Sequence, residues 1–343
     1  MSQTVLVTGA GGYIGATLVD RLLAAGHRVI GLDRYFFGED LLGDTRQHPS
    51  FTLLRKDVRA VDASDLRGVD AVCDLAALSN DPSGALDEGL TYAINHAARV
   101  RIADLAKRAG VKRYILASSC SVYGSGDGTP LTEDSRPQPI STYARANLKA
   151  ETDILPMSDK TFTATALRQA TVFGLAKRMR FDLVVNLMTL NAVQKRKIFI
   201  TGGGRQWRPI VHVEDTAGAF VSLLDRASSE IGGRVFNIGS SEHNYQVLSL
   251  AYIVRESLPF PIELEIVPDD SDSRDYHVSF RRAEQELGFR ALKTPGDGAR
   301  EVYEALKLGR IDTGIRTITV KWYEHILDAK RLVDRLAIDG RLL

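Results

Sequence analysis

Short runs of apolar residues recur through the first half of the chain. Each run is continuous and lacks the apolar–polar alternation of a strand with one exposed face. Runs of this kind predict strands that are buried on both faces, as in a parallel sheet covered by helices. The predicted strands are Thr4–Val7, Val29–Leu32, Phe51–Leu54, Ala71–Leu75, Tyr114–Ala117 and Phe162–Leu167.

Between these strands the apolar positions recur with the spacing of helices. The segments Ile14–Ala25 and Tyr92–Ala109 show this spacing most clearly. Strands that alternate with helices in this order predict an α/β fold built on a doubly wound parallel sheet.

The pattern changes after about residue 175, where strands and helices no longer alternate regularly. No repeat or low-complexity linker separates the two halves, so we expect two interleaved domains. The first covers 1–174 with a return at 208–240, and the second, smaller one covers mainly 175–343. In the second half we predict helices at Asp182–Gln194, Thr216–Leu224, Val247–Leu258 and Gly298–Leu306, and strands at Lys197–Thr201 and Val235–Gly239.

Composition excludes several classes of function. The chain has 343 residues, 44 of them basic and 43 acidic, so its net charge of +1 predicts neither a nucleic-acid surface nor a polybasic membrane anchor. A secretion signal and an apolar run of the roughly 18 residues that span a membrane are both missing, so we expect a cytoplasmic protein. The two cysteines, Cys73 and Cys120, lack the spacing of a metal or redox pair, and we expect no metal site.

A glycine-rich turn directly follows the first predicted strand. Gly9, Gly12 and Gly15 are spaced as in a dinucleotide-binding turn, and Tyr13 and Ile14 open the next helix. Such glycines allow a tight turn, close approach of a pyrophosphate and close helix contact, while the helix N-terminus offers unpaired N–H groups to the anion. The sequence therefore predicts a Rossmann-type cofactor site.

An acidic residue ends the second predicted strand. There Asp33 can accept hydrogen bonds from the adenosine ribose and would repel a 2′-phosphate, which favours NAD over NADP. Arg34 is the opposing signal, because its guanidinium could hold that phosphate. The residues after the third and fourth strands are placed to contact the adenine and the phosphates: Asp57, Val58, Leu75, Ala76 and Ala77.

Several motifs in order give the chain a family resemblance. They are the glycine turn, Asp57, Leu75-Ala-Ala, Asn95, Ser118-Ser-Cys-Ser-Val-Tyr-Gly and Tyr143. With them the chain resembles the extended short-chain dehydrogenase/reductase family, in its NAD-dependent nucleotide-sugar epimerase/dehydratase branch, over about residues 3–310. The resemblance implies NAD as cofactor, a nucleotide-sugar substrate held mainly by the second domain, and a homodimer formed through the helices near 92–109 and 143–155.

The resemblance also implies catalytic roles. Tyr143 would be the base that removes a proton from a sugar hydroxyl, and Ser119 would share that proton. The family's lysine, four residues after the tyrosine, lowers the phenol's pKa and holds the nicotinamide ribose, but here Asn147 occupies that position. Lys149 is rotated by about 240° from Tyr143 on a helix and cannot replace it. The oxidised nicotinamide would then be the one evident cation near the phenol.

Two outcomes follow from this departure. If Tyr143 merely lacks its helper, Asn147→Lys should raise the rate; if the site is reorganised around asparagine, the added ammonium should be poorly accommodated. In the second case Cys120 is the first candidate for another acid/base, although a thiol there is more often a small buried hydrophobe.

The remaining site residues also come from the resemblance. Asn95 and Asn147 would contact the cofactor, and the substrate diphosphate would meet Asn186, Arg208 and Arg274. The segment 176–182 departs from the family's usual Gly-Pro sequence, so we expect a reshaped loop over the sugar.

The function predicted by the resemblance is epimerisation through a transient 4-keto sugar. Cys120 and Ser121 stand where the family's 4,6-dehydratases carry an Asp-Glu pair, which disfavours dehydration. The alternatives are a reductase or dehydratase acting on the same kind of substrate, or a catalytically weakened protein that binds NAD and a nucleotide sugar.

Overall fold

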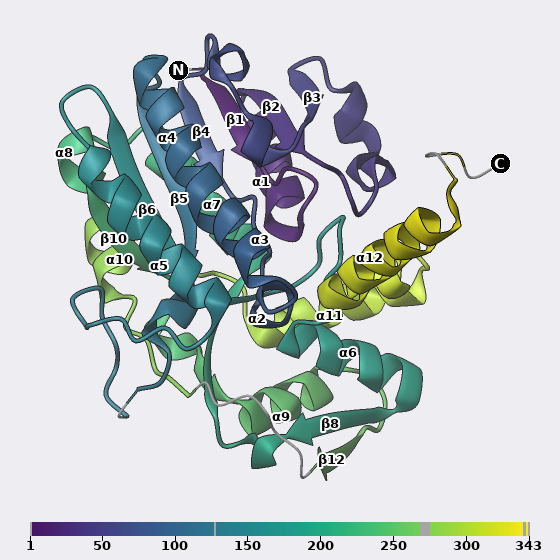
Figure 1. Ribbon diagram of the computed structural model, residues 1–343. Coiled ribbons are helices and arrows are strands. Elements are labelled where there is room, and N and C mark those ends of the chain that lie inside the picture. The colour runs from purple at the N-terminus through teal and green to yellow at the C-terminus, as the bar shows by residue number, and fades with distance from the viewer. Residues whose placement is uncertain (1, 127, 268–274, 339–340, 342–343) are drawn as a thin grey trace.

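A parallel sheet of seven strands forms the centre of the molecule (Figure 1). The computed structural model describes residues 2–126, 128–267, 275–338 and 341. The strand order is β10-β6-β5-β4-β1-β2-β3, and every neighbouring pair is parallel. The strands are β1 Thr4–Thr8, β2 Arg28–Asp33, β3 Phe51–Arg55, β4 Ala71–Asp74, β5 Arg113–Ser119, β6 Thr163–Gln169 and β10 Arg234–Ile238.

Helices cover both faces of this sheet, which confirms the predicted doubly wound fold. One face carries α1 (Tyr13–Ala24), α7 (Val213–Leu223) and α10 (Arg281–Glu286). The other carries α4 (Arg99–Arg108) and α5 (Thr142–Ile154). Every residue of β4 and β6 is buried, as continuous apolar runs require.

The predicted helix Tyr92–Ala109 is interrupted. It consists of α3 (Glu88–Tyr92), a π-helical turn (Ala93–Ala98) and α4. The side chain of Asn95 points out of the π turn to the backbone of Leu78, where its Oδ1 accepts from N at 2.9 Å and its Nδ2 donates to O at 3.1 Å. The sequence pattern did not predict this local widening, which involves only one turn.

Two smaller sheets lie beyond the central one. One has the order β11-β9-β7 and the other pairs β12 with β8. Their strands are β7 Thr171–Phe173, β8 Lys197–Thr201, β9 Trp207–His212, β11 Asn244–Gln246 and β12 Glu263–Val267. The remaining helices are α2 Asp81–Gly84, α6 Val184–Lys195, α8 Ser228–Ile231, α9 Val247–Ser257, α11 Pro295–Lys307 and α12 Thr319–Leu336.

The helix α12 is not among the predicted elements. Figure 1 shows it in yellow at the margin of the molecule, and Thr319 is its one buried residue among those described. Its first turns nevertheless contact the segment after β2: Trp322 Nε1 donates to the carbonyl of Phe36 at 2.8 Å. The helix therefore reaches the carboxyl edge of the central sheet, where ligands of doubly wound folds bind.

Candidate active site

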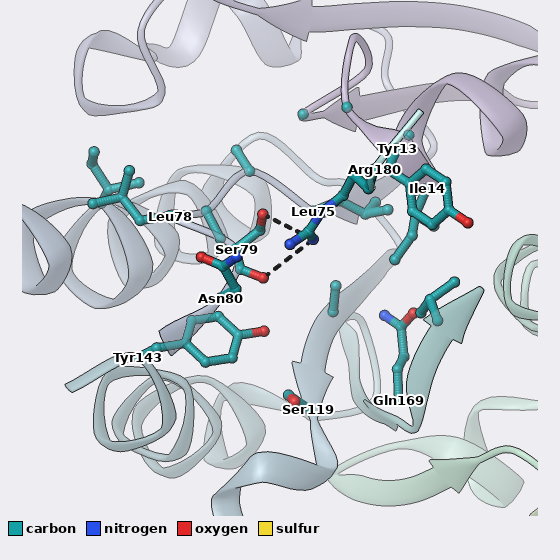
Figure 2. Close-up of a pocket in the computed structure, with 18 of the residues that line it drawn as sticks. Tyr13, Ile14, Leu75, Leu78, Ser79, Asn80, Ser119, Tyr143, Gln169 and Arg180 are labelled. Carbon is teal, nitrogen blue, oxygen red and sulfur yellow. Dashed lines mark hydrogen bonds between the residues drawn. The ribbon is translucent and has the colours of Figure 1, made fainter. Parts of the chain in front are cut away.

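A cavity opens at the carboxyl edge of the central sheet (Figure 2). Loops that follow β1, β2, β4, β5 and β6 all contribute to its wall, as expected where parallel strands end together. Most of the predicted site residues line it: Gly9, Gly12, Tyr13, Ile14, Gly15, Asp33, Arg34, Asp57, Val58, Leu75, Ala76, Ala77, Ser119 and Tyr143.

The glycine turn has the geometry that an anion-binding loop needs. Gly9 has φ +73°, and a Cβ on Gly15 would lie 2.0 Å from the carbonyl oxygen of Gly9. Gly12 is the N-cap of α1, and among the described residues no side chain caps this helix and no acid occupies its first turn. Its N–H groups are thus open to a pyrophosphate, so the loop fits NAD.

Asp33 lines the cavity where an adenosine ribose would lie. Its Oδ1 accepts from the N–H of Tyr35 at 2.7 Å and its Oδ2 from that of Gly11 at 3.0 Å. Burial raises the pKa of this carboxyl, and the same backbone hydrogen bonds oppose that shift. The carboxylate thereby also fixes the glycine turn.

Arg34 forms an ion pair with Asp57. Its Nη1 lies 3.0 Å from Asp57 Oδ2. Asp57 also pairs with Arg59, whose hydrogen bond is the main reason that the pKa of Asp57 is lowered to about 2. Two guanidinium groups thus share the single carboxylate of Asp57, and the preference for NAD rests on Asp33.

Tyr143 and Ser119 face the same space, as Figure 2 shows. Ser119 ends β5, and Tyr143 lies in the first turn of α5, whose cap Ser141 accepts from the N–H of Ala144 at 3.1 Å. Gly84 lets α2 approach α5 closely at Tyr143, since a Cβ on Gly84 would lie 3.0 Å from the Tyr143 Cβ. Two hydroxyls on rigid elements thus meet at the cavity wall.

Several groups act on the Tyr143 phenol. Burial raises its pKa most, and the carboxylate of Asp81 raises it further. Arg99, a hydrogen bond with Ser119 and Arg180 lower the pKa, in that order. The expectation that the nicotinamide would be the one evident cation near this phenol is therefore wrong.

Arg180 comes from the loop that departs from the usual family sequence. It lines the cavity, its Nη1 is 3.3 Å from Ser79 Oγ (Figure 2), and its Nε and Nη2 bind Asp182 at 3.0 and 2.9 Å. The same loop inserts Arg178, whose pKa burial lowers to about 10. This loop thus places two buried guanidinium groups in the cavity wall, and its reshaping over the sugar stays a prediction.

Arg99 was not anticipated from the sequence, although a signal was present. It lies four residues after Asn95 and three before Ile102, which places it on the buried face of its helix. The side chain is 2% exposed and lines the cavity. A charged residue on a buried helical face is rare and calls for a functional reason.

Cys120 is placed where it cannot act on a ligand in the cavity. Its neighbours Ser119 and Ser121 line the cavity, whereas the Cys120 side chain turns into the core and its thiol donates to the carbonyl of Arg168 at 3.3 Å. Burial raises the pKa of the thiol. The structure therefore argues against the acid/base role considered for this cysteine.

Three further predicted contacts lie outside the cavity wall. Asn95 holds Leu78, as described above. Asn186 is buried, accepts from the N–H of Gly174 at 2.9 Å and donates to Tyr13 Oη at 3.1 Å. Arg208 is buried on β9. None of the three residues lines this cavity, and the ligand contacts expected of them stay predictions.

Two other predicted residues complete the set. Asn147 is buried behind Tyr143 and does not line the cavity. Arg274 lies outside the described residues.

In the part of the chain that the structure describes, no cluster of three His, Cys, Asp or Glu side chains could hold a metal ion. None of the described helices is long and apolar enough to cross a membrane.

Comparisons with known proteins identify the family of the chain. The family model described as "NAD dependent epimerase/dehydratase family" matches residues 5–239. The UDP-glucose 4-epimerase of Mycolicibacterium smegmatis is 30% identical over 311 residues, which cover 87% of this chain and 97% of the relative. UDP-glucuronic acid decarboxylase 1 of Danio rerio is 27% identical and covers 88% of this chain and 72% of its own length.

A solved structure shows the same architecture. MoeE5 in complex with UDP-glucuronic acid and NAD has a TM-score of 0.77 at 28% identity, and the match covers 89% of this chain and 99% of MoeE5. The resemblance inferred from the sequence motifs is therefore confirmed.

Proposed function

Because the chain belongs to the NAD-dependent epimerase/dehydratase family, we propose that it is a 4-epimerase of a nucleotide sugar. The family is NAD-dependent, and the relatives include UDP-sugar 4-epimerases. One observation carries the proposal: the Tyr143 and Ser119 hydroxyls meet in the cavity that the glycine turn and Asp33 line. This arrangement joins a proton acceptor to a dinucleotide site.

The chain's own residues would move the proton. NAD, when bound at the glycine turn, supplies a reversible hydride acceptor. Tyr143 removes the proton of the sugar 4-hydroxyl as a ketone forms at that carbon, and Ser119 stabilises the phenolate through its hydrogen bond. The keto sugar then rotates in the cavity and presents its opposite face. Tyr143 returns the proton to the same oxygen, so the configuration at the 4-carbon is inverted without net oxidation.

The substrate class rests on the relatives. Their names include UDP-glucose and UDP-glucuronic acid, and these sugars are the first to test. Dehydration is the weaker alternative, because Cys120 is buried in the core and no carboxylate follows Ser119 directly. A protein that binds both ligands without turnover is the further outcome that a kinetic test distinguishes.

Turnover in deuterated water tests this function. We expect UDP-glucose or UDP-glucuronic acid to be converted to the 4-epimer without solvent deuterium on the ring carbons, because the hydride returns within the site. Tyr143→Phe should lower the rate by roughly 10³-fold, the range of general-base contributions, with NAD affinity unchanged. Tyr252→Phe, on the exposed side of α9, is the control.

The results have distinct meanings. Deuterium next to the ketone position or loss of carbon dioxide would identify another reaction of the family. Full activity of Tyr143→Phe would remove the proposed base. Binding of NAD and sugar without any product would assign the protein to the binding class.

We also propose a domain division and an assembly. Residues 1–174 with 208–240 would bind NAD and the rest of 175–343 mainly the sugar nucleotide; the pairing of β10 with β6 supports the return. A cytoplasmic homodimer through α4 and α5 is the proposed working form. A shallow groove along α4, α5 and the turns next to them supports it, lined by His96, Ala97, Val100, Arg101, Asp104, Arg108, Asp153 and Met157.

A further inference from the structure

Asn147 connects the turn that carries Tyr143 to a buried guanidinium. Its Oδ1 accepts from Arg99 Nη1 at 2.8 Å, and its Nδ2 donates to the Tyr143 carbonyl at 3.0 Å. Arg99 and Asn147 are 2% and 1% exposed. A hydrogen bond to a charged donor is shorter and stronger than a neutral one, so the amide holds the guanidinium firmly beside α5.

Arg99 is fixed from two further sides. Its Nε donates to the Ala76 carbonyl and its Nη1 to the Ala117 carbonyl, both at 3.2 Å. Ala76 follows β4 and Ala117 lies near the end of β5, and both residues line the cavity. The guanidinium therefore spans the two strand ends and α5 with little freedom to move.

The chemistry of the pair explains the asparagine. A lysine at this position has only N–H donors, so it would remove one of the two acceptors of Arg99 Nη1 and would bring two cations into contact. Asparagine offers an acceptor and no charge. Arginine at 99 and asparagine at 147 are therefore a matched pair, and each accounts for the other.

Nearby carboxylates decide how much of the charge Tyr143 experiences. Asp74 Oδ2 is 3.7 Å from Arg99 Nε, on the side away from Asn147, and already accepts from Tyr114 Oη at 2.5 Å. Asp74 Oδ1 accepts from Thr8 Oγ1 at 2.5 Å. Asp74 is thus engaged from three directions, and the Nη1 end of the guanidinium lies toward α5.

Arg180 is the second guanidinium that acts on Tyr143, and a carboxylate neutralises it more fully than Arg99 is neutralised. Arg180 binds both oxygens of Asp182, at 3.0 and 2.9 Å, so this pair projects a weaker field than a lone guanidinium. Asp81, held by the Ser141 hydroxyl, acts on the phenol in the opposite sense. In the part of the chain that the structure describes, Arg99 is the one positive group acting on Tyr143 that has no bidentate carboxylate partner.

We propose that Arg99, held in place by Asn147, supplies the positive charge beside Tyr143 that a lysine four residues after the tyrosine would otherwise provide. Arg99 acts through Tyr143 and not on the sugar, so it is a positioning and electrostatic residue. Its contribution to the rate rests on the proposed function. Its effect on the phenol does not, because the ionisation of Tyr143 can be measured without substrate.

The test compares charge with hydrogen bonding at position 99. Arg99→Gln keeps donors for the carbonyls but removes the charge, whereas Arg99→Lys keeps the charge. The pKa of Tyr143 is measured as the ultraviolet absorbance difference between each protein and its Tyr143→Phe counterpart. We expect Arg99→Gln to raise this pKa by about 1 to 2 units and Arg99→Lys to leave it within about half a unit.

Moving the charge gives the decisive comparison. The double variant Arg99→Gln/Asn147→Lys should bring the Tyr143 pKa back toward the unaltered value. The acid limb of the kcat/KM profile should shift with the Tyr143 pKa. At neutral pH the kcat/KM of Arg99→Gln should fall by about 10- to 100-fold, and it should recover as the pH rises through the raised Tyr143 pKa. Arg67→Gln, which removes an exposed charge before β4, should change neither quantity.

Other outcomes would overturn the proposal. An unchanged Tyr143 pKa in Arg99→Gln excludes the electrostatic role, as does an equal loss of activity in the Gln and Lys variants at every pH. Urea unfolding and NAD affinity identify a misfolded variant, in which case the Lys variant and the double variant decide. If no nucleotide sugar is turned over but the titration moves with the charge, the proposed function fails and the role of Arg99 stands.

Discussion

The amide of Asn147 both accepts from a guanidinium and donates to a helix carbonyl, and both contacts are buried. Asn147→Lys alone should therefore remove an acceptor and place an ammonium beside Arg99. We expect the free energy of unfolding to fall by about 3 kcal/mol, the scale of an uncompensated buried charge, with no gain in rate at neutral pH. Urea denaturation and a pH–rate profile measure the two effects.

Lys149→Asn is the control for this change. Lys149 is exposed two residues later on the same helix, so the reverse exchange there should leave stability within about 0.5 kcal/mol. A faster Asn147→Lys enzyme of unchanged stability would show that Tyr143 merely lacked a helper. Of the two outcomes that the sequence left open, the contacts favour a site organised around asparagine.

At the scale of elements, α12 completes the cavity wall next to β2. Tyr323 lines the cavity, and its ring centroid lies 6.3 Å from that of Phe36 and 5.6 Å from that of Phe37. Both phenylalanines belong to the segment directly after Asp33. The helix thus fixes the segment that would enclose the adenosine half of NAD.

We predict that Tyr323→Ala weakens NAD binding about tenfold, since loss of two aromatic contacts of about 0.5–1.5 kcal/mol each frees that segment. Calorimetric titration with NAD measures the effect. Leu332→Ala, near the exposed end of the same helix, should bind NAD normally. Equal affinity in the Tyr323 variant would mean that α12 does not support the cofactor site.

At the scale of the whole molecule, the outer face of α4 and α5 is the proposed contact between two subunits. Ala97→Glu should shift a dimer to monomers at micromolar concentration, because a charge in the groove would be desolvated on association. Light scattering gives the mass. Ala329→Glu, on exposed α12, is the matched control. A monomer in the unaltered protein would exclude the proposed assembly.

The central sheet is built from strands that are far apart in the sequence. The sheet receives its last strand, β10, after the chain has passed through β7, β8 and β9. The return segment 208–240 thus completes the first proposed domain, and its helix α7 packs on α1. Ala283 and Leu287 of the second proposed domain belong to the same core. We infer that neither half folds as an independent unit.

The sequence by itself determined the parallel sheet and its glycine turn. Continuous apolar strands and spaced glycines are local patterns, and local backbone and burial requirements dictate them. The same holds for Asp33, Ser119 and Tyr143, which lie at the carboxyl ends of strands or at the start of a helix. For these residues, position along an element fixes position in the cavity.

The tertiary structure alone decided the charges around Tyr143. Arg99 and Arg180 lie 44 residues before and 37 after the tyrosine in sequence, and contacts between separate elements bring them to it. It likewise turned Cys120 into the core while its serine neighbours face the cavity. The electrostatic potential at the phenol depends on all charges that are near it in space, whatever their position in the sequence. A lysine missing from a local motif therefore gives no information about a cation that another helix supplies.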